Sequence, residues 1–284
     1  KEINCVYSEK LKLSDVAEII NNLDEKKVNI KVLDNKLGNS YCGFKNYTDF
    51  ASVKGLKNGI KFMYNKIKNK INLVDLKENI KCIIFDFDDT LVYSEDIKKQ
   101  VFFKIAREYG VNEEKYMIEV RDENKYTRYQ IFQKFCNKFN IQSDYENLLD
   151  KYKIMTRKEI IKTDNLHGVI ELLDYLREKT QLKIFISSKS SKEDLDYYVQ
   201  ERNWNKYFDG VYGLPDNKTY HINQIKKNYN LKSNEILFIG DSTGDYKVSM
   251  NNNLYFIGVE NFALQNINCT KIDNLMKIIK LIIF

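Results

Sequence analysis

From about residue 80 onward, short apolar runs alternate with longer segments of helical period. Runs of four to seven apolar residues indicate buried strands, and apolar residues at every third or fourth position indicate amphipathic helices. This alternation is typical of an α/β fold with a doubly wound parallel sheet. The expected strands are 81–87, 182–187, 210–213, 235–240 and 254–258, and the expected helices are 166–179, 191–202, 219–229, 243–252 and 272–283.

The first two expected strands are about a hundred residues apart, whereas a crossover connection needs only about a dozen. Segments 95–109, 128–139 and 144–162 read as amphipathic helices rich in Phe, Tyr and Ile. We therefore expect a small helical cap at 94–165, inserted between core segments 80–93 and 166–284.

The first 75 residues have a pattern of their own. It predicts a helix at 14–22, a strand at 28–33, a loop with Gly38 and Gly43, and a helix at 55–69. We expect a small α/β appendage that contains no catalytic constellation.

Composition adds little about partners. The net charge is +6, but the Lys residues are spread along the chain and no basic stripe is interleaved with aromatic residues. This predicts a solvated basic surface that attracts anionic substrates and binds no nucleic acid.

Cysteine usage and apolar segments bear on the compartment. Five cysteines without metal-ligand spacing argue for a reducing cytoplasm, and Cys82 is expected in the core. No apolar stretch reaches the length of a membrane span, and the closing segment NLMKIIKLIIF is expected to be a docked helix. The chain begins without Met and is therefore expected to be processed or cut from a longer protein.

The strongest chemical signal is the sequence Asp-Phe-Asp-Asp-Thr-Leu at 86–91, directly after the first strand. Ligands of doubly wound sheets bind at the carboxyl ends of the strands, so Asp86 and Asp88 enter the expected crevice. One carboxylate can attack phosphorus. The second can protonate the leaving oxygen and then activate water.

Two further strand ends and a Lys between them complete this pattern. Ser187 and Ser188 follow the second strand and can hold phosphoryl oxygens before a helix N-terminus. Asp241 and Asp245 follow the fourth strand, in the sequence GDSTGD; Asp241 with Asp86 and Asp88 offers oxygen ligands for Mg²⁺. Lys218 is placed to neutralise phosphoryl charge.

In this order, these four elements resemble the four motifs of the haloacid dehalogenase superfamily over about residues 80–262. The resemblance implies a phosphatase with a C1-type helical cap that requires Mg²⁺. It implies Asp86 as nucleophile and metal ligand, and Asp88 as acid/base with its main-chain carbonyl on the metal. The other implied roles are a steadied loop at Thr90, phosphoryl binding by Ser187 and Lys218, and metal ligation by Asp241, with Asp245 supporting it or binding through water.

The acid at position 88 is absent from superfamily members that act as dehalogenases or resemble P-type ATPases. The resemblance therefore implies hydrolysis of a small phosphate monoester, such as a sugar or polyol phosphate. Three alternatives stay open: a phosphomutase or phosphotransferase with the same residues, a catalytically quiet binding module, and an N-terminal interaction platform with an attached phosphatase.

The cap is expected to set specificity because it closes over small substrates. Arg121, Lys125, Arg128 and Tyr129 form a polar cluster that either reads the leaving group or is a solvated helix face. His167 and His221 have no metal-ligand spacing and are expected in the cap or on the surface.

A second, looser resemblance covers the N-terminal 70 residues. The segments KLSDVAEIINNL and VNIKVLDNKLGNSYCGFKNYTDF, followed by KGLKNGIKFMYNKIK, resemble the C-terminal lobe of extended short-chain dehydrogenases that act as nucleotide-sugar epimerases. Neither GxGxxG nor YxxxK with a partner Ser is present, so this part cannot bind a dinucleotide by itself. The resemblance implies fusion to, or association with, a nucleotide-sugar enzyme, and hence a role in carbohydrate metabolism.

Overall fold

The computed structural model describes residues 76, 79–112, 115, 128–142 and 145–282. The chain divides into two compact units, Lys1–Asn72 and Leu73–Phe284. The elements expected within residues 1–75 lie outside the described residues. Arg121 and Lys125, from the expected cap cluster, lie outside them as well.

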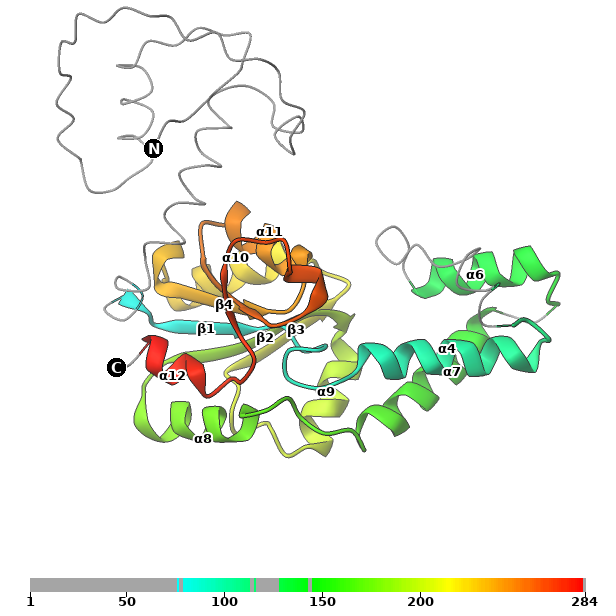
Figure 1. The fold of residues 1–284 in the computed structure, drawn as a ribbon, viewed down its shortest axis with the longest axis horizontal. Helices are drawn as coiled ribbons and strands as arrows, with labels where there is room; N and C mark the ends of the chain where they lie inside the picture. Colours follow the sequence, from blue (N-terminus) through cyan, green and yellow to red (C-terminus); the bar gives the residue numbers. More distant parts are fainter. Residues whose placement is uncertain (1–75, 77–78, 113–114, 116–127, 143–144, 283–284) are drawn as a thin grey trace, which may run out of the picture. The chain divides into compact units, whose positions relative to one another are not determined.

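One sheet of six parallel strands runs through the second unit, in the order β3-β2-β1-β4-β5-β6 (Figure 1). Strand β1 (Cys82–Phe85) pairs with β2 (Lys183–Ser191) on one side and with β4 (Ile236–Gly240) on the other. The other strands are β3 (Gly210–Leu214), β5 (Tyr255–Val259) and β6 (Thr270–Ile272). The predicted doubly wound α/β fold and its five predicted strands are confirmed.

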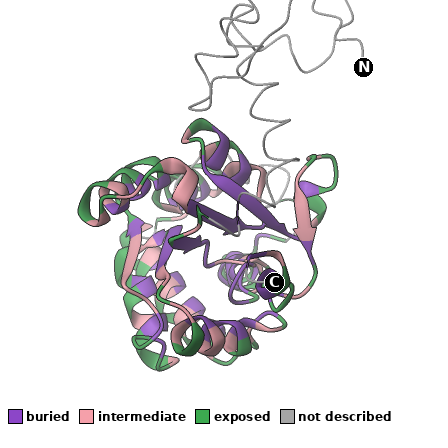
Figure 2. Cartoon of the chain, turned by 90° about the vertical axis from the view of Figure 1, so that its left-hand side faces the viewer, coloured by how far each residue is buried: buried purple, intermediate pink, exposed green. Residues whose placement is uncertain are grey.

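Helices cover both faces of this sheet, and Figure 2 shows its strands buried between them. Side chains of a strand alternate between the faces, so Cys82 and Ile84 join one apolar cluster while Ile83 and Phe85 join another. The helices of the first cluster are α10 (Lys218–Tyr229) and α11 (Thr243–Asn251), and those of the second are α8 (Val169–Lys179), α9 (Lys192–Glu201) and α12 (Lys277–Ile282).

Three helices between β1 and β2 form a separate layer, called the cap here: α4 (Glu95–Glu108), α6 (Arg128–Phe139) and α7 (Tyr145–Ile160). Their apolar faces bury a cluster of their own. At its centre the ring of Phe102 lies 5.0 Å from that of Phe132 and 4.3 Å from that of Tyr152, measured between centroids. The three predicted cap helices are therefore confirmed within a residue or two.

The end of the chain departs from the prediction. The segment expected as a helix at 272–283 begins only at Lys277, because residues 270–272 pair with β5 as the short edge strand β6. Cys82 is fully buried, as expected. Within the part of the chain that the structure describes, no helix has the length and apolar character needed to cross a membrane.

Candidate active site

Three buried carboxylates meet at the carboxyl ends of β1 and β4. Asp86 follows β1 directly, and its backbone N–H donates to the carbonyl of Ile239 at 2.8 Å. Asp241 follows β4, and Asp245 lies in the first turn of α11. Oxygen atoms of Asp86, Asp241 and Asp245 all lie within 4.8 Å of one another. The predicted convergence of the first and last motifs is present in the structure.

Lys218 brings a positive charge to this cluster from the first turn of α10. Its Nζ lies 2.8 Å from Asp86 Oδ1 and 2.5 Å from Asp245 Oδ1. The helix begins here because the Asn217 side chain accepts from the N–H of Tyr220 and so caps it. Lys218 is buried, so its charge acts on these carboxylates in a poorly solvated site.

The burial of several like charges perturbs their protonation. Burial raises the pKa of Asp86 well above its ordinary value, and Lys218 opposes that rise. Burial, followed by repulsion from Asp245 and Asp89, raises the pKa of Asp241 to about 7. For Lys218, burial lowers the pKa, but Asp86 and Asp245 outweigh it and raise the pKa above its usual range. The site therefore holds more negative charge than one Lys can balance.

This excess of buried carboxylate fits a divalent cation. Asp86 Oδ1 is buried and accepts no aligned hydrogen bond from any described residue, although Lys218 lies close to it as an ion pair. Carboxylate oxygens are hard ligands, and Mg²⁺ takes a few of them together with substrate phosphate. Asp86, Asp241 and Asp245 have the chemistry and the spacing to hold such an ion.

Thr90 and Asn261 support Asp241. Thr90 Oγ1 donates to Asp241 Oδ1 at 3.5 Å, at the outer limit of a hydrogen bond, and Thr90 is fully buried. Asn261 Nδ2, from the loop after β5, donates to Asp241 Oδ2 at 2.7 Å. At Gly240 a Cβ atom would lie 2.6 Å from Asp245 Cγ, so only glycine allows α11 to approach β4 this closely.

Asp88 turns away from this cluster towards the cap. Its oxygens accept hydrogen bonds from Ser94 at 2.6 Å and from Ser190 at 2.7 Å, and Lys98 Nζ from helix α4 lies 2.5 Å away. Burial raises the pKa of Asp88, but the ion pair and these hydrogen bonds outweigh it and hold the pKa below its usual range. The two carboxylates of the first motif thus lie in different surroundings.

The two serines after the apolar part of β2 point in different directions. Ser187 Oγ lies 2.9 Å from His221 Nδ1 on α10, whereas Ser188 Oγ donates to Asp88 Oδ2 at 3.4 Å. The reason is strand alternation: Phe185 and Ser187 share the face that α10 covers, so Ser188 faces the other way. Of the predicted phosphate-binding pair, Ser188 is therefore the one beside Asp88.

His221 was expected in the cap or on the surface and is in fact buried against the sheet. Burial lowers the pKa of this imidazole, so the neutral form is favoured. His167 is exposed, as expected.

Several residues near Asp88 were not predicted from the sequence. Lys98 and Ser190 contact Asp88 directly, and they come from segments 92 residues apart. Asp89 has a left-handed backbone with φ of 50°. Its Oδ1 accepts from the N–H groups of Ser94 and Glu95, which fixes the start of cap helix α4. Asp89 thus joins the motif to the cap.

Of the predicted cap cluster, the structure brings Arg128 to this place. Arg128 Nη2 donates to Ser190 Oγ at 3.4 Å. Tyr129 instead lies on the surface, 41% exposed, where its hydroxyl donates to that of Tyr145.

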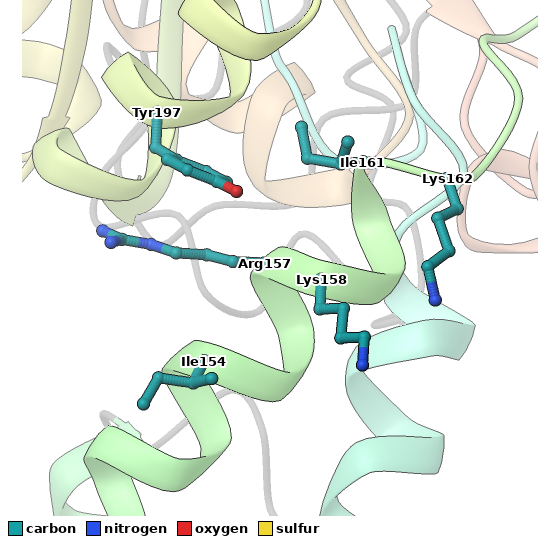
Figure 3. A pocket seen from close by; sticks show the side chains of 6 residues that line it. All are labelled: Ile154, Arg157, Lys158, Ile161, Lys162 and Tyr197. Carbon is teal, nitrogen blue, oxygen red and sulfur yellow. The ribbon is translucent and has the colours of Figure 1, made fainter.

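A separate hollow of about 400 Å³ lies between α7 and α9 (Figure 3). Ile154, Ile161 and Tyr197 contribute its apolar surface, and the other lining residues are Arg157, Lys158 and Lys162. Arg157 is engaged with Asp194 and Glu193. None of the lining residues belongs to the acidic cluster, so we place the candidate chemistry at the strand ends and not in this hollow.

Comparisons with known proteins bear on the family and the fold. Residues 83–259 match the family model described as haloacid dehalogenase-like hydrolase. No curated protein sequence matches the chain.

Several solved structures are similar to this chain. One is a candidate HAD-hydrolase, YfnB of Bacillus subtilis, bound to magnesium: 16% identity, TM-score 0.57, covering 72% of this chain and 98% of that one. A predicted phosphoglycolate phosphatase of Haemophilus somnus 129PT shares 17% identity, with TM-score 0.56, and covers 72% and 98%. A candidate beta-phosphoglucomutase of Thermotoga maritima shares 15%, with TM-score 0.55, and covers 68% and 93%.

These likenesses concern the fold, and the family match spans more than half of the chain. The chain therefore belongs to the haloacid dehalogenase-like hydrolase family.

Proposed function

We propose that this protein hydrolyses a small phosphate monoester by transfer of the phosphoryl group to Asp86. This proposal is supported by the different surroundings of two carboxylates that lie close together in the sequence, Asp86 and Asp88. Asp86 lies among Lys218, Asp241 and Asp245 at the strand ends. Asp88 faces the cap, held by Ser94, Ser190 and Lys98. This difference supports Asp86 as the group that attacks phosphorus and Asp88 as the group that transfers the proton of the leaving oxygen.

In the first step an oxygen of Asp86 bonds to phosphorus and the bond from phosphorus to the ester oxygen breaks. Asp88 gives that leaving oxygen a proton, and the second step returns a proton from water to Asp88. In the second step Asp88 takes a proton from water while the water oxygen attacks the same phosphorus. Inorganic phosphate leaves and Asp86 is restored as a carboxylate. Lys98 favours the ionised form of Asp88, which is the form that accepts a proton from water.

Mg²⁺, held by Asp86, Asp241, Asp245 and the main-chain carbonyl of Asp88, would supply positive charge against the phosphoryl oxygens. Lys218 adds a second positive charge beside Asp86. The hydroxyl of Ser188, beside Asp88, is placed to donate to a phosphoryl oxygen. Each of these groups lowers the cost of charge that builds up on phosphate oxygens in the transition state.

Phosphate release from a panel of sugar, polyol and hydroxy-acid phosphates tests this function. We expect turnover by the full chain with Mg²⁺, none with EDTA, and a loss of about 10³-fold or more in Asp86→Asn. Asp150→Asn, a carboxylate of helix α7 that is not part of the site, should keep full turnover. Release that is unaffected by Asp86→Asn would overturn the proposal.

A phosphomutase would use the same residues, and one similar structure bears that description. Its signature is a requirement for a bisphosphate activator and the return of the phosphoryl group to a sugar. Repeating the assay with sugar monophosphates, with and without the matching bisphosphate, distinguishes the two: accumulation of free phosphate indicates the phosphatase, and an isomeric sugar phosphate indicates the mutase.

A further inference from the structure

Helix α6 of the cap places a guanidinium next to the proposed acid/base. Arg128 Nη2 donates to Ser190 Oγ at 3.4 Å, and the same hydroxyl donates to Asp88 Oδ2 at 2.7 Å. A single hydroxyl group thus separates Arg128 from Asp88. The guanidinium carbon lies 5.5 Å from the ring centroid of Tyr152, and this cation–π contact helps to hold the guanidinium in place.

The charge of Arg128 is only loosely matched by the described residues. Among the described residues, its Nη1 forms an ion pair with Asp194 Oδ2 at 3.6 Å. Asp194 is already held closely, by Arg157 Nε at 2.7 Å and by Ser191 Oγ at 2.6 Å. The Arg128 side chain keeps 32% of its surface exposed. Arg128 can therefore accept a further anionic partner.

Lys98, the other cap cation at this place, is not available in the same way. It lies 2.5 Å from Asp88 Oδ1 and 2.9 Å from Glu95 Oε1, and its side chain is 8% exposed. Its charge is thus matched by two carboxylates. Of the described cations beside Asp88, Arg128 is therefore the one that remains open to a ligand.

The proposed chemistry fixes where the leaving group lies. The phosphoryl group sits by Asp86, and the leaving oxygen must contact Asp88 to receive its proton. The remainder of the ester then extends past Asp88 towards Ser190 and Arg128, since these groups border Asp88 on the cap side.

We infer that the substrate is a phosphate monoester whose leaving group carries a second anionic group, a carboxylate or a phosphate, and that Arg128 binds it. A guanidinium presents paired N–H groups that match the oxygens of either anion. This inference rests on the proposed function, because it takes Asp86 and Asp88 as the residues that flank the reacting phosphorus.

Matched ester pairs test the inference with the full chain and Mg²⁺. The carboxylate pair is 2-phosphoglycolate with ethyl phosphate, and the phosphate pair is fructose 1,6-bisphosphate with fructose 1-phosphate. We expect kcat/KM to favour the anionic member of one pair by about tenfold or more, the size of a charge-assisted hydrogen bond. The pair that shows the preference identifies the anion.

Variants at position 128 assign the preference to this residue. Arg128→Gln should reduce the ratio of kcat/KM between the two members of the pair towards one. Arg128→Lys should give an intermediate ratio because it keeps the charge but loses the paired N–H groups of the guanidinium. Lys134→Gln removes an exposed cation from the same helix and should leave the ratio as it is. A ratio near one in the unaltered protein for both pairs, or an equal loss on both members in Arg128→Gln, overturns the inference.

A binding measurement separates this inference from the proposed function. Titration with 3-phosphonopropionate and with propylphosphonate needs no turnover, and we expect about tenfold tighter binding of the carboxylate ligand if the second anion is a carboxylate. Fructose 1,6-bisphosphate and fructose 1-phosphate, titrated into Asp86→Asn, give the same comparison for phosphate. Hydrolysis of p-nitrophenyl phosphate reports on the proposed function alone. If p-nitrophenyl phosphate is not hydrolysed but the selective anion binding remains, the hydrolase is refuted and the anion site stands. If p-nitrophenyl phosphate is hydrolysed but binding shows no preference for the second anion, the anion site is refuted and the hydrolase stands.

Discussion

At the scale of single residues, the acidic cluster depends on Lys218. Its ammonium group lies within 2.8 Å of Asp86 and 2.5 Å of Asp245, and all three side chains are buried. Lys218→Gln leaves these carboxylates without a compensating charge. We expect a loss of about 3 kcal/mol in the free energy of unfolding, measured by urea denaturation without Mg²⁺, and a fall of about 10²-fold in turnover.

Lys226→Gln is the matched control on the same helix. Lys226 donates to Ser233 Oγ in a half-buried position, so its loss should cost less than about 1 kcal/mol. Mg²⁺ should restore more stability to Lys218→Gln than to the control, because the ion replaces the missing charge. Equal stability of the two variants without metal would contradict this account of the cluster.

The motif residues themselves could be predicted one by one from the sequence, whereas their contacts with the cap could not. Asp86 and Asp241 each follow an apolar strand, which places them at one edge of the sheet. Lys98 is different: in the sequence it is one of several lysines in a helical segment, and only the fold brings it to Asp88. Asn261 likewise reaches Asp241 from a loop with no signal of its own.

At the scale of elements, the side chains of β2 alternate between the two faces of the sheet, and this decides which serine lies beside Asp88. Ser188→Ala should lower kcat/KM by about tenfold or more, because its hydroxyl lies beside Asp88. Ser187→Ala should instead lower the free energy of unfolding by about 1 kcal/mol, because it removes the hydrogen bond with His221. Steady-state kinetics and urea denaturation of both variants measure the two effects. The reverse assignment would show that β2 presents the other face to substrate.

Strand β3 is anchored to its neighbours through Asp209. Asp209 Oδ2 accepts from the N–H of Ile184 at 2.9 Å and from Arg177 at 2.8 Å, and Oδ1 accepts from Lys183 at 3.0 Å. Burial raises the pKa of Asp209, but these hydrogen bonds outweigh it and lower the pKa below its ordinary value. A carboxyl with a depressed pKa stabilises the fold above the pKa of the unfolded chain.

Asp209→Asn should therefore cost about 1 kcal/mol at neutral pH, after allowance for solvent screening. The difference from the unaltered protein should shrink as the pH falls below about 4, where Asp209 becomes protonated in both states. Urea denaturation from pH 3 to pH 7 measures it. Asp196→Asn, in an exposed pair with Lys192, should leave the free energy of unfolding almost unchanged. If the loss of stability in Asp209→Asn instead grew as the pH fell, the expected direction would be wrong.

Among the elements, long periodic segments and apolar strands could be predicted, whereas the edge of the sheet could not. Strand β6 has three residues, of which Ile272 is the one that is buried, so its sequence carries no strand pattern. Residues 270–272 form a strand because they pair with β5, and a pairing with another segment cannot be read from the local sequence. The helix predicted at 272–283 accordingly starts too early.

At the scale of the whole molecule, the compact unit Leu73–Phe284 contains the family match and the candidate site. Leu76 is buried in the apolar cluster on the sheet face that α8, α9 and α12 cover, and the N–H of Ile80 donates to its carbonyl. A chain shortened to 73–284 should keep phosphate release within about twofold, and one shortened to 80–284 should lose about 2 kcal/mol because Leu76 is gone.

Turnover and urea denaturation of both shortened chains check this expectation. Loss of folding in 73–284 would show that the first unit is part of the catalytic scaffold. If the chain shortened to 73–284 folds and releases phosphate, the first unit is free for another role. Because that unit resembles the lobe of a nucleotide-sugar enzyme, we propose that it associates with such an enzyme.

The proposed function depends on transfer of the phosphoryl group to Asp86. The most direct measurement is to quench the full chain during turnover with substrate and Mg²⁺, reduce it with borohydride, and locate the modified residue by peptide mass spectrometry. Reduction converts an aspartyl phosphate into homoserine, so we expect homoserine at position 86 and at no other position, and only when substrate is present. Phosphate release accompanied by homoserine at another aspartate, or by none at position 86 under conditions that trap the intermediate, would contradict it.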